Sequence, residues 1–117
     1  MRAAELRAIP AEDVLAYVQS IHHEFNIPNT ILSHPKWRKA RVPLNKLHIP
    51  DPESGVDLDD PYNRVQNIDM DHVEDIHLQD IKNKPIVTDS DGWVLDGNHR
   101  ATAARARGLE TIPALVP

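Results

Sequence analysis

Residues 84–116 read KPIVTDSDGWVLDGNHRATAARARGLETIPALV, and this stretch decides the fold. Two short apolar runs, residues 85–88 and 93–95, flank an Asp-Gly turn, which predicts a β-hairpin. The alanine-rich run that follows favours a helix, and Gly108 is a typical residue at which a helix ends. Residues 112–116 are mostly apolar and are predicted to form a final strand.

Upstream of this stretch the sequence predicts further helices and one strand. Pro10 suits the first turn of a helix, and apolar residues recur at helical spacing after it. Residues 41–49 alternate in polarity as a strand does, and Pro43 places that strand near a sheet edge. Asp69 or Asp71 is expected to cap a short helix.

These elements predict an α+β fold with a mixed sheet and flanking helices. We interpret residues 41–117 as the domain and residues 1–40 as an N-terminal helix followed by an arm, which is irregular over residues 26–40. Residues 50–61 are rich in proline and acids, which is typical of a surface loop. A chain of 117 residues that is 40% hydrophobic has enough apolar side chains for one core but not for two.

Composition excludes several classes of site. The chain has no cysteine, which excludes disulfides, zinc–thiolate sites, iron–sulfur clusters and thiol chemistry. No run approaches the roughly 20 apolar residues that cross a bilayer, and the N-terminal residues lack the pattern of a signal peptide. We therefore expect a cytoplasmic protein that does not bind membranes.

The turn Asp96-Gly97-Asn98-His99-Arg100 joins the predicted hairpin to the predicted helix. Gly97 can adopt a positive φ, so the helix can begin directly after the strand with its unpaired N–H groups free to bind phosphate. Arg100 can clamp phosphate oxygens, and His99 can donate a hydrogen bond or move a proton. Asp96 would hold Mg²⁺ or accept a proton from an attacking hydroxyl. Taken alone, the pentapeptide is equally compatible with a salt-bridged structural turn.

The order of elements around this turn resembles the ParB/sulfiredoxin superfamily. Residues 84–104 and 108–116 are similar to its hairpin, its Gly-x-x-Arg turn, its alanine-rich helix and its GL-x-x-IP entry to the last strand. Residues 42–47 and 65–81 are a weaker match to its first strand and helical lead-in. The resemblance implies a small ParB/sulfiredoxin-like domain over residues 41–117.

Three chemistries are known in that superfamily. Sulfiredoxins need a cysteine where Asn98 stands, so sulfiredoxin activity is excluded. ParB partition proteins bind CTP and carry a helix-turn-helix region after this domain, which we do not find here. Free serine kinases have an Asp-Gly-His-His-Arg turn, and residues 96–100 differ from it at one position. The resemblance therefore implies a nucleoside triphosphate ligand (ATP or CTP), Mg²⁺ and a small-molecule acceptor.

The resemblance also suggests two site residues upstream of the turn. The kinases use a glutamate after the first strand as general base, and Glu53 or Asp51 is the candidate here. Arg64 resembles an arginine of the ParB phosphate-binding box, although it could equally be a surface residue beside an acidic loop. The predicted catalytic residues are thus Asp96, His99 and Glu53.

Three functions remain open: an NTP hydrolase or phosphotransferase, a ParB-like nuclease, and a non-catalytic nucleotide-binding or partner-binding module. Nucleic acid could bind a basic segment with one aromatic residue, namely Lys36, Trp37, Arg38, Lys39 and Arg41. The net charge of −5 weighs against extensive DNA contact. The adjacent histidines at His22 and His23 point in different directions on a helix and are interpreted as surface residues.

Overall fold

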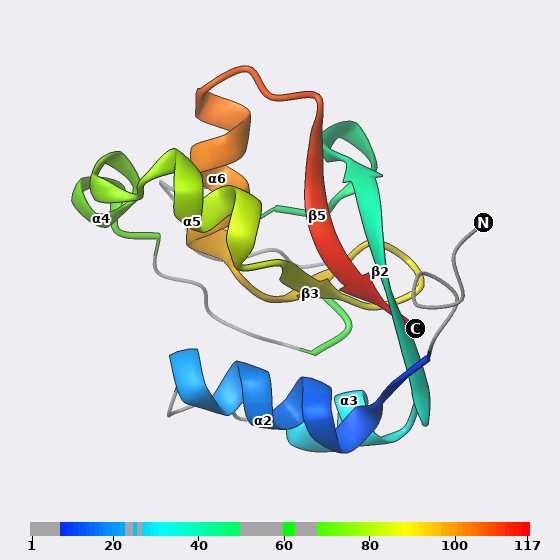
Figure 1. Ribbon diagram of the computed structural model, residues 1–117. Coiled ribbons are helices and arrows are strands. Elements are labelled where there is room, and N and C mark those ends of the chain that lie inside the picture. The colour runs from blue at the N-terminus through cyan, green and yellow to red at the C-terminus, as the bar shows by residue number, and fades with distance from the viewer. Residues whose placement is uncertain (1–7, 23–24, 26, 50–59, 63–67) are drawn as a thin grey trace.

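The computed structural model describes residues 8–22, 25, 27–49, 60–62 and 68–117. They form a mixed sheet with flanking helices, as predicted, and the sheet has five strands (Figure 1). The strands are β1 (Ile9–Pro10), β2 (Lys36–Pro43), β3 (Ile86–Thr88), β4 (Val94–Asp96) and β5 (Thr111–Val116). The helices are α2 (Ala11–Ile21), α3 (Pro28–Leu32), α4 (Met70–Asp75), α5 (Leu78–Asn83) and α6 (Asn98–Ala106), with a 3₁₀ turn at Leu44–Lys46.

The strands lie in the order β1-β2-β5-β3-β4. β3 pairs with β5 in parallel, and every other neighbouring pair is antiparallel. The predicted hairpin is confirmed, since Val87 lies opposite Asp96 and Thr88 opposite Val94. Only Gly97 separates the end of β4, an edge strand, from the start of α6.

Both faces of the sheet are covered (Figure 1). Side chains alternate between the faces along a strand, so Ile86 and Val94 pack in one apolar cluster with residues of α4, α5 and α6. Val87 and Leu95 point the other way and pack with α2 and α3. The strand before the Asp96-Gly97 turn is therefore fixed from both sides.

The N-terminal helix α2 is an integral part of this packing. Val14 and Val18, one turn apart, are fully buried against the sheet. Tyr17 Oη donates a hydrogen bond of 2.6 Å to the carbonyl of Pro85, which immediately precedes β3. These contacts anchor α2 beside the hairpin that carries the turn.

Two predictions for the connecting segment are wrong. Residues 26–40 contain α3 and the larger part of β2, and the strand predicted over residues 41–49 ends at Pro43. β2 begins earlier because it pairs along β5 from Arg38 to Pro43 and also with β1 at Lys36 and Trp37, and these long-range pairings are invisible in local alternation. The boundary placed after residue 40 lies inside this strand.

The predicted acidic loop over residues 50–61 lies almost wholly outside the described residues. The capping prediction is confirmed, because the Asp69 carboxylate accepts hydrogen bonds from the first N–H groups of α4. Among the described helices, none has the length and apolar character needed to span a membrane.

Candidate functional site

The turn of residues 96–100 is a strand-to-helix junction, as predicted. Gly97 has φ 99° and ψ 26°, a left-handed conformation, and its carbonyl accepts the first hydrogen bond of α6 from Ala101 N–H at 2.9 Å. A Cβ at Gly97 would lie 2.5 Å from Cγ2 of the buried Ile86. Glycine is thus required here both by the backbone conformation and by the close approach to β3.

The start of α6 opens into a cavity of about 400 Å³, which suits a small organic ligand. In the described part of the chain no side chain caps this helix end. The first N–H groups of a helix have no carbonyl partner within it and carry its positive dipole end. The polar residues that line the cavity are His22, His72, Asp80, Lys84, Asp96, Asn98, His99 and Arg100.

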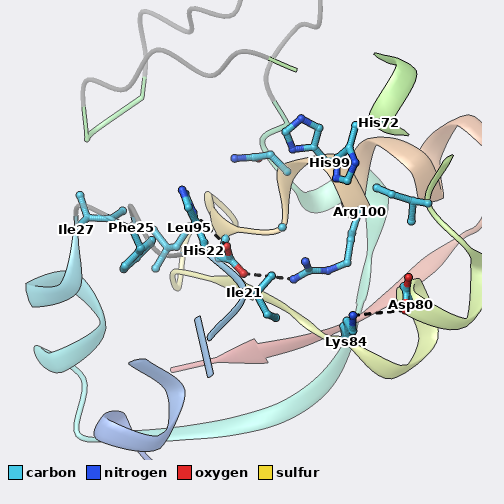
Figure 2. Close-up of a pocket in the computed structure, with 14 residues that line it drawn as sticks. Ile21, His22, Phe25, Ile27, His72, Asp80, Lys84, Leu95, His99 and Arg100 are labelled. Carbon is cyan, nitrogen blue, oxygen red and sulfur yellow. Dashed lines mark hydrogen bonds and ion pairs between the residues drawn. The ribbon is translucent and has the colours of Figure 1, made fainter. Parts of the chain in front are cut away.

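Arg100 lies under the turn and interacts with the end of β4 (Figure 2). One of its terminal nitrogens lies 3.3 Å from Asp96 Oδ2 and 3.3 Å from the carbonyl oxygen of Pro85. The arginine side chain is 10% exposed and the aspartate side chain 5%. The Arg100 Nε is buried without a hydrogen-bond partner among the described residues.

Asp96 is flanked by two side chains that can be positive. Arg100 lies on one side, and His22 Nδ1 lies 3.6 Å from Asp96 Oδ1 on the other. A buried carboxylate needs such compensation, because desolvation disfavours its charge. The pair with Arg100 offsets much of the arginine's charge, so a phosphate in the cavity would need further donors.

His99 holds the start of α4 against the start of α6. Its Nε2 accepts a hydrogen bond of 3.1 Å from Asp69 N–H, which assigns the proton of the neutral ring to Nδ1. The ring packs edge to face against His72, with centroids 4.9 Å apart. Burial, followed by the neighbouring His72, lowers the pKa of His99. The neutral ring therefore dominates at neutral pH and can donate through Nδ1.

The predicted site residues that the structure describes come together. Asp96, Gly97, Asn98, His99 and Arg100 line one cavity, as expected. Glu53, Asp51 and Arg64 lie outside the described residues.

The basic segment lies elsewhere, on β2. Trp37 is 1% exposed, and its Nε1 donates to the carbonyls of Ile31 and His34, so its ring is not accessible for stacking on a base. The side chains of Lys36, Arg38, Lys39 and Arg41 are exposed, and none of them lines the cavity. The aromatic part of the nucleic-acid expectation is therefore wrong.

Several lining residues were not anticipated from the sequence. His22 is exposed, as interpreted from the sequence, and it also lines the cavity together with Ile21 and Phe25 (Figure 2). Lys84 also lines it and lies 3.6 Å from Asp80, one turn earlier. Only the packing of α2 onto the second face of the sheet brings the N-terminal segment here, and no local pattern encodes that packing.

The donor set of the cavity does not form a metal site. Nowhere in the described ranges do three His, Asp or Glu side chains gather as they would around a metal. The Asp96 carboxylate faces Arg100 and His22, so binding Mg²⁺ would require it to leave Arg100. The described residues therefore do not fit a resident Mg²⁺.

Comparisons with known proteins do not assign a family. No protein-family model matches the chain, and neither a curated protein nor a solved structure is significantly similar to it.

Proposed function

We propose that the chain is a ParB/sulfiredoxin-like domain that binds a nucleoside triphosphate, ATP or CTP, through the turn of residues 96–100. The observation that carries the proposal is the cavity of about 400 Å³ at the start of α6. Backbone N–H groups at a helix start, a glycine with positive φ and a buried arginine together form a phosphate-binding arrangement. The order of strand, turn and helix is the order that the resemblance drawn from the sequence implies.

The other walls of the cavity suit the organic part of such a ligand. Ile21, Phe25 and Ile27 line it on the side of α2, and Leu95 lines it from β4. Ligand sites for small organic molecules commonly combine an apolar lining with a few polar groups. A nucleoside could lie against these side chains while its phosphates face Gly97.

The proposed reaction is hydrolysis of the terminal phosphate or its transfer to a small hydroxyl acceptor. Arg100 and the N–H groups of α6 would hold the phosphates, and Nδ1–H of His99 would stabilise charge that develops on the transferred group. Mg²⁺ would arrive bound to the nucleotide phosphates rather than held by a site of the protein's own. Glu53 stays a prediction for the general base.

Affinity measurements with matched variants test this proposal. We expect ATP or CTP to bind the full chain with a dissociation constant below about 1 mM, and Arg100→Lys to weaken binding by at least tenfold, since lysine lacks the planar fork. Arg105→Lys, also on α6 but outside the cavity, is the control and should leave the affinity unchanged. Amide spectra of both variants check that they fold. An absence of nucleotide binding at millimolar concentration would refute the proposal.

The nuclease alternative is tested with the same samples. The exposed cations of β2 do not line the cavity. A nuclease that cleaves DNA at the turn and also binds it through these cations would therefore contact DNA at two places. Cleavage of plasmid DNA by the pure protein, lost in Arg100→Lys and kept in Arg105→Lys, would favour that alternative over nucleotide chemistry.

A further inference from the structure

His22 is the residue that follows α2, and it approaches the turn from the opposite side to Arg100. Its backbone N–H donates to the carbonyl of Val18 at 2.8 Å, which closes the last turn of α2. Its Nδ1 lies 3.6 Å from Asp96 Oδ1. The His22 side chain is 52% exposed, whereas that of Asp96 is 5% exposed. The imidazole therefore lies at the cavity mouth with one edge toward a buried carboxylate.

Two contacts fix the segment that carries this imidazole. Tyr17, on the preceding turns of α2, donates to the Pro85 carbonyl, which also accepts from Arg100. The ring of Phe25, which is 9% exposed, meets the His22 ring edge to face with centroids 6.1 Å apart. α2 is thus tied through Tyr17 to the same backbone carbonyl as the arginine of the turn.

The charges that line the cavity leave a phosphate in need of hydrogen-bond donors, and His22 can be one of them. Arg100 is paired with Asp96, and Lys84 is paired with Asp80, so the fixed charges that line the cavity cancel. A phosphate binds such a site through groups that can still donate. The backbone N–H groups of His99 and Arg100, which have no backbone acceptor among the described residues, supply some of them. The His22 imidazole can supply another, because its Nδ1 faces Asp96 and its Nε2 lies on the other edge of the ring.

We infer that His22 is a ligand-binding residue of this cavity: as an imidazolium, which carries a proton on each ring nitrogen, it keeps Nδ1–H toward Asp96 and donates from Nε2 to a phosphate oxygen. The ligand class is a phosphate ester or anhydride whose phosphate lies between the end of α2 and the start of α6. This inference rests on the proposed function and extends it, because it makes the N-terminal segment part of the site.

The test uses the full chain, ATP and CTP as probes, and two substitutions of His22. His22→Ala removes the donor and should weaken nucleotide binding about tenfold, the lower end of the effect of a hydrogen bond to a charged group, because the side chain is half-exposed. His22→Gln offers an amide donor and should recover part of the loss. His77→Ala is the control, since His77 is exposed at the start of α5 and does not line the cavity.

A spectroscopic signature separates ligand contact from a purely structural role. In the wild-type chain the ¹⁵N resonance of His22 Nε2 should shift when nucleotide is added, and that of His77 should not. Nucleotide binding by the wild type with equal affinity in His22→Ala, or an unmoved Nε2 resonance, would overturn this inference and leave the proposed function standing. Failure of the wild type to bind any nucleotide would overturn both. If His22→Ala does not fold, His22→Gln and the Nε2 resonance still decide.

Discussion

Replacing Gly97 with alanine tests the reason why a glycine stands between β4 and α6. Its φ of 99° is a left-handed conformation, which costs an L-residue roughly 1–2 kcal/mol. The new Cβ would also lie 2.5 Å from Ile86 Cγ2 and 2.9 Å from the Arg100 guanidinium. Ile86 is fully buried and cannot move aside without shifting β3.

The magnitude follows from adding these two effects. Overpacking of a core typically costs about 1–3 kcal/mol. Together with the backbone strain, we expect Gly97→Ala to lower the free energy of unfolding by about 2–5 kcal/mol. Displacing Arg100 would also lengthen its contacts with Asp96 and the Pro85 carbonyl, so the loss of stability should extend to the site.

Gly108 provides the matched control for this substitution. It also has a positive φ, 73°, but a Cβ there would meet no atom within 4 Å. Gly108→Ala should therefore cost only the strain, about 1 kcal/mol. Urea unfolding of both variants, followed by circular dichroism and extrapolated to water, gives the comparison. A Gly97→Ala variant that loses no more stability than Gly108→Ala would refute the close approach of the turn to β3.

Three further predictions concern the contacts around the site. The pKa of His99 is lower in the folded state than in the unfolded chain, so the folded state favours the neutral ring. The resulting contribution to stability should be complete above pH 6.5 and be lost as the pH falls through the folded pKa. Urea unfolding should therefore depend less on pH in His99→Gln than in the wild type. Asp69→Ala should lower the free energy of unfolding by about 1 kcal/mol, because it removes the cap of α4. Asp71→Ala, at an exposed position in the first turn of the same helix, should lower it by less in the same urea unfolding measurement. Tyr17→Phe should cost about 0.5–1 kcal/mol in a thermal or urea unfolding measurement, because the Pro85 carbonyl keeps its bond from Arg100. A loss of more than about 2 kcal/mol would show that the two donors depend on each other.

The hairpin, the turn and α6 could be predicted from the sequence because their signals are local. Asp91-Gly92 marks the hairpin turn, and alanines mark the helix that ends near Gly108. The functional expectation at Gly97 also rests on local geometry, since a positive φ depends only on the residue and its neighbours.

The connector and the far wall of the cavity could not be predicted in this way. β2 extends back to Lys36 because it pairs with β1 and β5. Trp37 is buried against α2 and α3, although its basic neighbours in the sequence suggest an exposed segment. His22 reaches the turn only because α2 packs on the second face of the sheet. These features depend on contacts between residues that are distant in sequence, which neither periodicity nor spacing records.

The most direct test of the central claim is a pair of amide spectra of the ¹⁵N-labelled full chain, recorded without and with millimolar ATP or CTP. We expect the largest shifts at the amides of residues 97–100, with smaller shifts at His22 and none at the exposed strand residues Arg38 and Lys39. Unchanged amides at residues 97–100 with both nucleotides would contradict the account.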